Sequence, residues 1–349
     1  MTQSEHGLRP KRPVPRPVVY AGMAAGAWSS LKVAGLIRAR REAAIAVRPE
    51  LRHWRNYLPL SPRGPVSLGL VRRFLTNETA PLDGVRTESV QVSHPAAEQF
   101  VPAFLYTPSN RHSNGALLWI HGGGTISGTA AVEHATAAGL ASRLGVPVLN
   151  VDYRLAPEHP FPLPFEDCWA GLVWLHANAE RLGVDPQRIA VGGTSAGGLL
   201  AAALAQKATD ERVPVCFQAL LAPMLDDRTS MYGTHGLGRV GWDAPANRFA
   251  WAAYRRREAA AAESRPYAVP ARRNRLTGLP PAWIAIGDID LFYPEDVDYA
   301  ERLQEDGVAC ELVVVEGMYH GAEDRCPDAP AIRRLRASMD AALTKAFSA

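Results

Sequence analysis

The sequence predicts an α/β fold with a mostly parallel central sheet, helices on both faces of the sheet and an added helical cap. Short runs of apolar, β-forming residues recur along the chain, and helical patterns lie between them, as is typical of parallel sheets. Several of these runs end in turns that carry glycine or a reactive side chain. The predicted strands cover residues 116–120, 188–192, 216–221, 282–286 and 311–315.

Length and composition agree with one large domain of this kind. The chain has 349 residues, of which 47% are hydrophobic and 21% are charged. These shares are ordinary for globular proteins, so they exclude a disordered chain and a membrane protein with several spans. The net charge of +3 gives no general case for nucleic-acid binding, and no finger, homeodomain or RNA-binding signature occurs.

The strand at 116–120 runs directly into His121, Gly122, Gly123 and Gly124. Glycines let the main chain approach a reacting group, and exposed N–H groups can stabilise the oxyanion of acyl transfer by about 2.7 to 4 kcal/mol for each donor. A phosphate-binding turn is the weaker interpretation, because the P-loop lysine and the G-x-G-x-x-G spacing are both missing. The three glycines are therefore candidate oxyanion donors.

The strand at 188–192 leads into the sequence Gly-Thr-Ser-Ala-Gly at 193–197, which fits the pattern G-x-S-x-G. A serine on a sharp turn between strand and helix has its Oγ pushed out of the sheet, and small neighbours are needed because the backbones crowd together. A helix is predicted from 196 to about 207. Ser195 is the candidate nucleophile, and the N–H of Ala196 is a further candidate oxyanion donor.

The last two predicted strands supply a candidate acid and a candidate base. Strand 282–286 is followed by Asp288 and Asp290, and strand 311–315 is followed by His320. Because parallel strands end at one edge of a sheet, these side chains are expected near Ser195. The pattern leaves open which aspartate faces the histidine, and the other is expected to cap the next helix.

Taken together, these motifs resemble the hormone-sensitive-lipase-like branch of the α/β-hydrolases, the bacterial esterase and lipase family with the HGGG signature. The resemblance spans roughly residues 85–345. It rests on HGGG at 121–124, DYRLAPEHPFP at 152–162, GTSAG at 193–197, GDIDLF at 287–292 and YHG at 319–321.

The resemblance implies an α/β-hydrolase fold with a helical cap and assigns the acid to Asp290. It also implies that Gly123 and Gly124 are oxyanion donors, with Gly122 the weaker candidate. The physical interpretation of the run at 152–162 is a rigid, proline-rich scaffold in which Arg154 and Glu158 are each able to pair their charges.

Three further residues are expected to face the substrate. The sequence has Thr194 where the family often has aspartate, and Thr125 where the family usually has a bulky side chain. Trp242 lies in a glycine-rich insert with other aromatic residues at partly helical spacing, so it is expected to line an apolar pocket, although packing of the cap is an equal alternative.

The domain boundaries follow from these assignments. The core is predicted at residues 81–225 and 277–349, and a second cap insert at 226–276. Within that insert, the neighbouring charges of Asp226, Asp227 and Arg228 are expected to be solvated.

The N-terminal region differs electrostatically from the rest of the chain. Residues 1–80 contain fourteen Lys and Arg against four Asp and Glu, a balance of +10, so the remainder carries −7. Residues 1–17 are predicted to be a basic, proline-rich, disordered lead, and 18–80 a cap segment. For 18–37, a membrane anchor and a signal peptide are weaker alternatives, because Lys32 interrupts the apolar stretch and the basic run at 38–41 directly follows it. A disordered or oligomerising arm is a further alternative.

Cysteine usage predicts neither a zinc site nor a disulfide framework. The four cysteines show no C-x-x-C or Cys/His ligand spacing, so they are expected to be free thiols in a protein that binds no metal. Together with the absence of a convincing signal peptide, this favours a cytoplasmic location. The cysteines are Cys168, Cys216, Cys310 and Cys326.

The predicted function is hydrolysis of carboxylic esters through an acyl-enzyme, with Ser195 as nucleophile, His320 as base and Asp290 as its partner. No cofactor is implied. The resemblance suggests small-molecule esters with short- to medium-chain acyl groups. The alternatives are an amide or arylacetamide hydrolase with the same triad, a binding-only module on the same fold, and a membrane-associated scaffold; a homodimer is left open.

Overall fold

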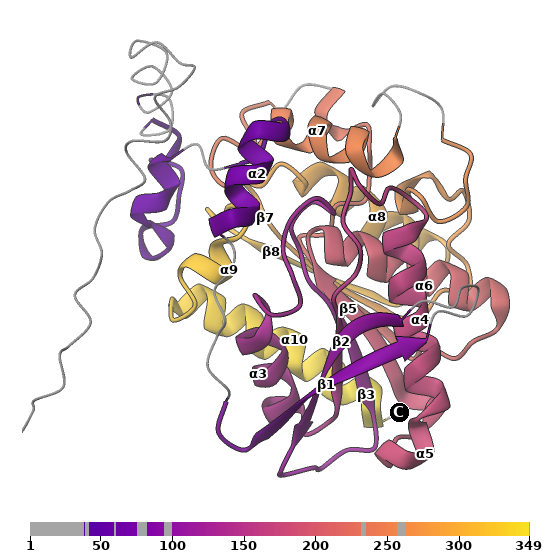
Figure 1. Ribbon diagram of the computed structural model, residues 1–349. Helices are drawn as coiled ribbons and strands as arrows, with labels where there is room; N and C mark the ends of the chain where they lie inside the picture. The colour runs from indigo at the N-terminus through magenta and orange to yellow at the C-terminus, as the bar shows by residue number, and fades with distance from the viewer. Residues whose placement is uncertain are drawn as a thin grey trace, which may run out of the picture.

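Eight strands form one sheet at the centre of the computed structural model (Figure 1). The strand order is β1-β2-β4-β3-β5-β6-β7-β8, in which β2 runs antiparallel to β1 and β4 and all other neighbours are parallel. The structure describes residues 38, 42–58, 61–74, 82–93, 100–231, 235–256 and 263–348. The strands are β1 (Val85–Ser93), β2 (Phe100–Pro108), β3 (Ala116–Ile120), β4 (Val148–Val151), β5 (Ile189–Thr194), β6 (Phe217–Leu221), β7 (Ala282–Gly287) and β8 (Cys310–Val315).

Helices cover both faces of the sheet. The apolar side chains of α4, α6 and α8 pack on one face, and those of α3 and α10 pack on the other. The described α-helices are α2 (Pro65–Phe74), α3 (His134–Leu144), α4 (Leu163–Ala177), α5 (Ala179–Leu182), α6 (Ala196–Glu211), α7 (Ala244–Arg255), α8 (Tyr293–Glu305), α9 (Ala322–Arg325) and α10 (Pro330–Ser348). Short 3₁₀ turns lie at Pro49–Leu51, Trp54–Tyr57, Pro186–Arg188, Thr229–Met231 and Pro270–Arg272.

Strand β3 illustrates how the sheet separates two cores. All five of its side chains are buried, since Leu118 and Ile120 point to the α4–α6–α8 layer while Leu117 and Trp119 point to the α3–α10 layer. This alternation across a fully covered strand is typical of parallel sheets. The predicted α/β fold is confirmed, and the five predicted strands lie within two residues of the observed ones.

The N-terminal region is described only in part. Residues 1–37 lie outside the described residues, and with them the predicted lead and the 18–37 segment. Residues 42–58 pack on the C-terminal part of the core, where the N–H of Arg48 donates to the carbonyl of Gly317 at 3.1 Å and Glu50 accepts from the N–H of Ala331 at 2.8 Å. No helix in the described part of the chain is long and apolar enough to cross a bilayer.

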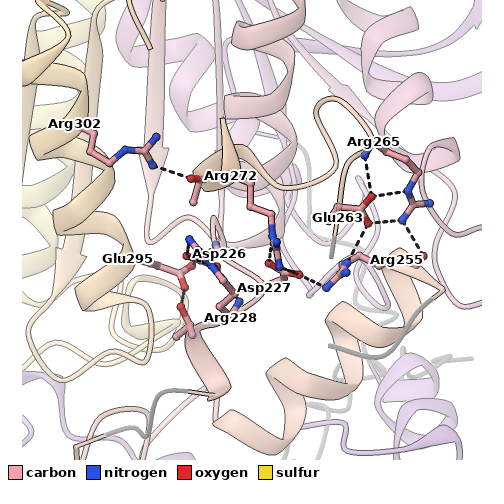
Figure 2. Close-up of polar contacts among 11 residues, drawn as sticks. Asp226, Asp227, Arg228, Arg255, Glu263, Arg265, Arg272, Glu295 and Arg302 are labelled. Atoms are coloured by element: carbon pink, nitrogen blue, oxygen red, sulfur yellow. Dashed lines mark hydrogen bonds and ion pairs between the residues drawn. The ribbon is translucent and has the colours of Figure 1, made fainter. Parts of the chain in front are cut away.

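The acidic pair Asp226 and Asp227, in the predicted second cap insert, differs in part from expectation. Asp227 is fully buried, so the prediction of a solvated cluster is wrong for it. It pairs with Arg255, which is also fully buried, and accepts a hydrogen bond from Arg272 Nε at 2.8 Å (Figure 2). Arginines 28 and 45 residues away supply the compensating charge, which a local charge pattern does not reveal. Only the Asp226–Arg228 pair is partly solvated.

The run at 152–162 supports neighbouring segments, and both Arg154 and Glu158 form ion pairs, as expected. Arg154 pairs with Asp167 at 2.7 Å, and Glu158 pairs with Arg72 at 2.8 Å. Both partners lie outside the run, Asp167 in α4 and Arg72 in α2, so the two charges connect the run to these helices. The hydroxyl of Tyr153 donates to the carbonyl of His121 at 3.0 Å, so the run also supports the glycine turn after β3.

Candidate active site

Ser195 lies between β5 and α6 in a conformation that few side chains adopt. Its φ of 57° and ψ of −117° bring the serine out of the sheet at the point where the strand turns into the helix. A Cβ on Gly193 would lie 2.5 Å from the carbonyl carbon of Gly197, and one on Gly197 would lie 2.0 Å from the carbonyl oxygen of Ile120. The expected crowding around the serine is therefore present, and only glycine fits at both positions.

Ser195, His320 and Asp290 form a continuous hydrogen-bonded chain. His320 Nε2 is 2.9 Å from Ser195 Oγ, and His320 Nδ1 is 2.8 Å from Asp290 Oδ2. Asp290 is fully buried, and Ser195 is 6% exposed. This geometry allows the histidine to accept the serine proton while the carboxylate stabilises the imidazolium and fixes the tautomer.

The surroundings of His320 favour its protonated form. Burial works to lower the pKa of the imidazole, but the charge of Asp290 and its hydrogen bond, together with the charge of Glu323, raise that pKa above its ordinary 6.5. Arg325 acts in the opposite direction. Glu323 itself is buried, and neither of its carboxylate oxygens has a hydrogen-bond partner among the described residues. Its burial and the neighbouring Asp324 raise the pKa of Glu323 to about 7, against the opposing charge of His320.

A matched pair of substitutions tests this electrostatic balance. A base must be neutral to accept the serine proton, so kcat/KM rises with pH through the raised pKa of His320. We expect Glu323→Gln to move this acidic limb to lower pH, and Arg325→Gln to move it to higher pH. The measurement is the pH profile of kcat/KM for one ester; shifts in the same direction for both variants would contradict the assignment.

The two candidate aspartates have different partners. Asp290 contacts His320, whereas Asp288 Oδ1 accepts a hydrogen bond from the N–H of Gly317 at 2.6 Å. The expectation that one of them caps the next helix is wrong, because α8 has Phe292 as its N-cap and no side-chain cap. Asp288 instead ties the loop after β7 to the loop that carries His320.

The glycine turn lies against the serine. A Cβ on Gly122 would lie 3.4 Å from Ser195 Cβ, and Gly123 and Gly124 have positive φ values of 112° and 65°. None of the hydrogen bonds found among the described residues is donated by the N–H of Gly123, Gly124 or Ala196. Ala196 is the first residue of α6, where an N–H group has no partner within the helix. These groups are thus available to an oxyanion beside Ser195.

The three residues that were expected to contact substrate have different surroundings. Trp242 packs on the glycine turn, since a Cβ on Gly124 would lie 2.7 Å from its ring, and its ring centroid is 6.4 Å from that of His320. Thr125 is fully buried and donates to the carbonyl of Gly124 at 2.6 Å, so it bonds within the turn, and its contact with substrate stays a prediction. Thr194 is also buried, at 8% exposed.

Sequence reasoning did not single out several residues around the triad. The ring of Phe292 meets that of His320 edge to face at 5.0 Å, and that of Tyr153 stacks on His121 at 4.1 Å. Phe292 and Tyr153 belong to motifs already recognised, so their position beside the catalytic loops was the available signal. Glu323 carried no signal, because nothing in the sequence shows that a carboxylate three residues after His320 is buried.

Within the described ranges, no group of three or more His, Cys, Asp or Glu side chains could hold a metal ion. All four cysteines are free thiols, and Cys168 is buried. Burial raises the pKa of that thiol well above its usual value, so Cys168 is a poor nucleophile.

Comparison with known proteins gives consistent relatives. The chain is 33% identical over 253 residues to the carboxylic ester hydrolase LipN of Mycobacterium tuberculosis, covering 70% of this chain and 66% of LipN. It is 33% identical over 263 residues to the carboxylesterase NlhH of the same organism, covering 71% and 79% of the two chains. The solved structure of a bacterial heroin esterase has a TM-score of 0.78 and 36% identity, and covers 87% of this chain and 98% of that one.

A family model described as the alpha/beta hydrolase fold matches residues 117–324, which run from β3 to α9. This range contains the glycine turn, Ser195, Asp290 and His320. The chain therefore belongs to the α/β-hydrolase superfamily, in its hormone-sensitive-lipase-like branch of esterases, as the sequence motifs predict.

Proposed function

We propose that the protein is a serine carboxylester hydrolase that works through an acyl-enzyme, with Ser195, His320 and Asp290 as its catalytic triad. The observation that carries this proposal is the hydrogen-bonded chain from Ser195 Oγ through His320 to Asp290. The names of relatives such as LipN, NlhH and the heroin esterase support the ester as the bond that is cleaved.

The proposed reaction has two similar halves. Ser195 Oγ attacks the ester carbonyl carbon while His320 Nε2 takes its proton, and the tetrahedral intermediate collapses as the alkoxide leaves with that proton. Water then attacks the acyl-enzyme, again losing a proton to His320, and the acid leaves as Ser195 recovers its hydrogen. The proposed oxyanion donors are the N–H groups of Gly123, Gly124 and Ala196.

The substrate class is proposed to be small-molecule esters with short- to medium-chain acyl groups. Trp242 supports this size limit, because its ring packs on Gly124 and its centroid is 6.4 Å from that of His320, so a bulky side chain occupies this part of the site. An amide substrate shares the machinery but is not favoured by any observation. A binding-only module is not favoured either, since all three triad side chains are present and in contact.

The proposal says less about the partners, the oligomeric state and the cellular location of the enzyme. A small-molecule ester is the only partner that the site requires, and a homodimer and a cytoplasmic location stay predictions. The free state of all four cysteines agrees with a reducing compartment.

The test is hydrolysis of p-nitrophenyl esters from acetyl to palmitoyl by the full chain. We expect the highest kcat/KM at short or medium acyl length and a steep fall beyond it. Matched anilides, which differ only at the scissile bond, should react far more slowly. Folded protein that cleaves no member of the series, or that prefers the anilides, would contradict the proposal.

A further inference from the structure

The segment at residues 61–74, which includes α2, contacts both sides of the catalytic region. At its start, Ser61 Oγ donates to the carbonyl of Gly241 at 2.8 Å, and Arg63 pairs with Asp243. These partners flank Trp242, whose ring lies on the glycine turn. Figure 1 shows α2 near α7. Asp243, the partner of Arg63, is the residue directly before α7.

At the other end of the segment, Arg72 binds the loops behind the oxyanion donors. Its Nε donates to the carbonyl of Ile126 at 2.7 Å, and its Nη2 donates to the carbonyl of Ala156 at 2.7 Å. The same guanidinium forms a two-pronged ion pair with Glu158, at 2.8 and 2.9 Å. This pairing lowers the pKa of Glu158, chiefly through the hydrogen bonds from Arg72. The side chain of Arg72 is 28% exposed, so water competes only in part.

Both carbonyl acceptors belong to residues that are themselves bonded to the oxyanion turn, defined here as residues 121–125. The N–H of Ile126 donates to the carbonyl of Gly123 at 3.2 Å, and the N–H of Ala156 donates to the carbonyl of Thr125 at 2.9 Å. Arg72 is therefore linked to the turn by two separate routes of hydrogen bonds, and each route passes through one intervening residue. A planar guanidinium can serve both carbonyls and a carboxylate at once, which a lysine ammonium cannot do in the same geometry.

We propose that Arg72 is a positioning residue that holds the oxyanion turn in its catalytic geometry, through the carbonyl groups of Ile126 and Ala156. The inference rests on the esterase function proposed above. Because an oxyanion hole acts by being formed before the charge develops, a turn that loses these two supports stabilises the transition state less while substrate binding changes little. The ion pair with Glu158 orients the guanidinium and is secondary.

The test compares Arg72→Ala with wild type on one short-chain p-nitrophenyl ester. We expect kcat to fall by about tenfold, since a displacement of about 1 Å at a catalytic group can cost up to 100-fold, while KM stays within about threefold. Added methylguanidinium should recover part of kcat in Arg72→Ala and leave wild type unchanged. A boronic acid that forms a tetrahedral adduct on Ser195 should bind more weakly by a factor similar to the loss in kcat.

Two matched variants separate positioning of the turn from docking of the helix. Glu158→Gln removes the charge of the ion pair but leaves both carbonyl contacts, so its kcat should stay within about twofold of wild type. Arg63→Gln loosens the opposite end of the same segment, and its effect should fall on KM. Thermal melting of every variant identifies any loss of activity that comes from unfolding.

The outcomes are distinct. A kcat for folded Arg72→Ala equal to that of wild type, or a loss of kcat that Arg63→Gln or Glu158→Gln reproduces in full, would overturn the positioning role. Loss of kcat with rescue by methylguanidinium supports it. If wild type itself cleaves no ester, the proposed function fails, whereas an active wild type with an unaffected Arg72→Ala contradicts this inference alone.

Discussion

Ser195→Ala is expected to abolish ester hydrolysis, with a loss in kcat on the order of 10⁶-fold. The reason is that the acyl-enzyme cannot form without Oγ, and the buried thiol of Cys168 is held in its protonated form by burial, so it cannot substitute. A fluorophosphonate probe should label wild type at this serine and leave the variant unlabelled. Labelling of Ser195→Ala at another residue, with activity retained, would move the nucleophile elsewhere.

The same position offers a second measurement that does not depend on activity. Ser195 has φ 57° and ψ −117°, which is unfavourable for any side chain with a Cβ and acceptable for glycine. We therefore expect Ser195→Gly to be as inactive as Ser195→Ala. It should melt at a higher temperature than Ser195→Ala, by an amount that corresponds to roughly 1 to 3 kcal/mol of relieved strain. Equal melting temperatures would show that the turn stores no strain at this residue.

The sequence was informative wherever local chemistry requires a particular residue type. The turn around Ser195 needs glycine at 193 and 197 because a Cβ at either position would lie 2.5 Å or less from main-chain atoms of Gly197 or Ile120, so the motif and its geometry are inseparable. The strand ends before Asp290 and His320 were equally readable, because buried parallel strands are short apolar runs. Which aspartate faces the histidine was supplied by the family resemblance and not by the pattern.

What the sequence could not predict depends on contacts between distant segments. Asp227 is buried because Arg255 and Arg272 reach it, and Glu158 meets Arg72 across 86 residues. Thr125 is buried, with a φ of 61° and its hydroxyl bonded to the carbonyl of Gly124. In each case the identity of the neighbours decides between solvated and buried, and spacing along the chain contains no such information.

Asp290→Asn is expected to lower kcat by about 10⁴-fold while leaving the fold intact. The argument concerns the two oxygens of Asp290: Oδ1 accepts from the N–H of Phe292 at 3.0 Å, and Oδ2 faces His320 Nδ1 at 2.8 Å. An asparagine keeps one acceptor, which the N–H of Phe292 requires, so the amide NH₂ is directed at His320. That group can only donate, which forces the imidazole proton onto Nε2 and removes the acceptor that Ser195 needs.

Asp288→Asn is the matched control for this prediction, because an asparagine Oδ1 can still accept from the N–H of Gly317, as the aspartate does at 2.6 Å. We expect its kcat to stay within about fivefold of wild type, since geometry is preserved and no tautomer changes. The measurement is kcat for both variants on one ester, with circular dichroism and melting curves to verify folding. A large loss in Asp288→Asn beside a mild one in Asp290→Asn would exchange their roles, whereas the expected order makes the tautomer of His320 the quantity that Asp290 controls.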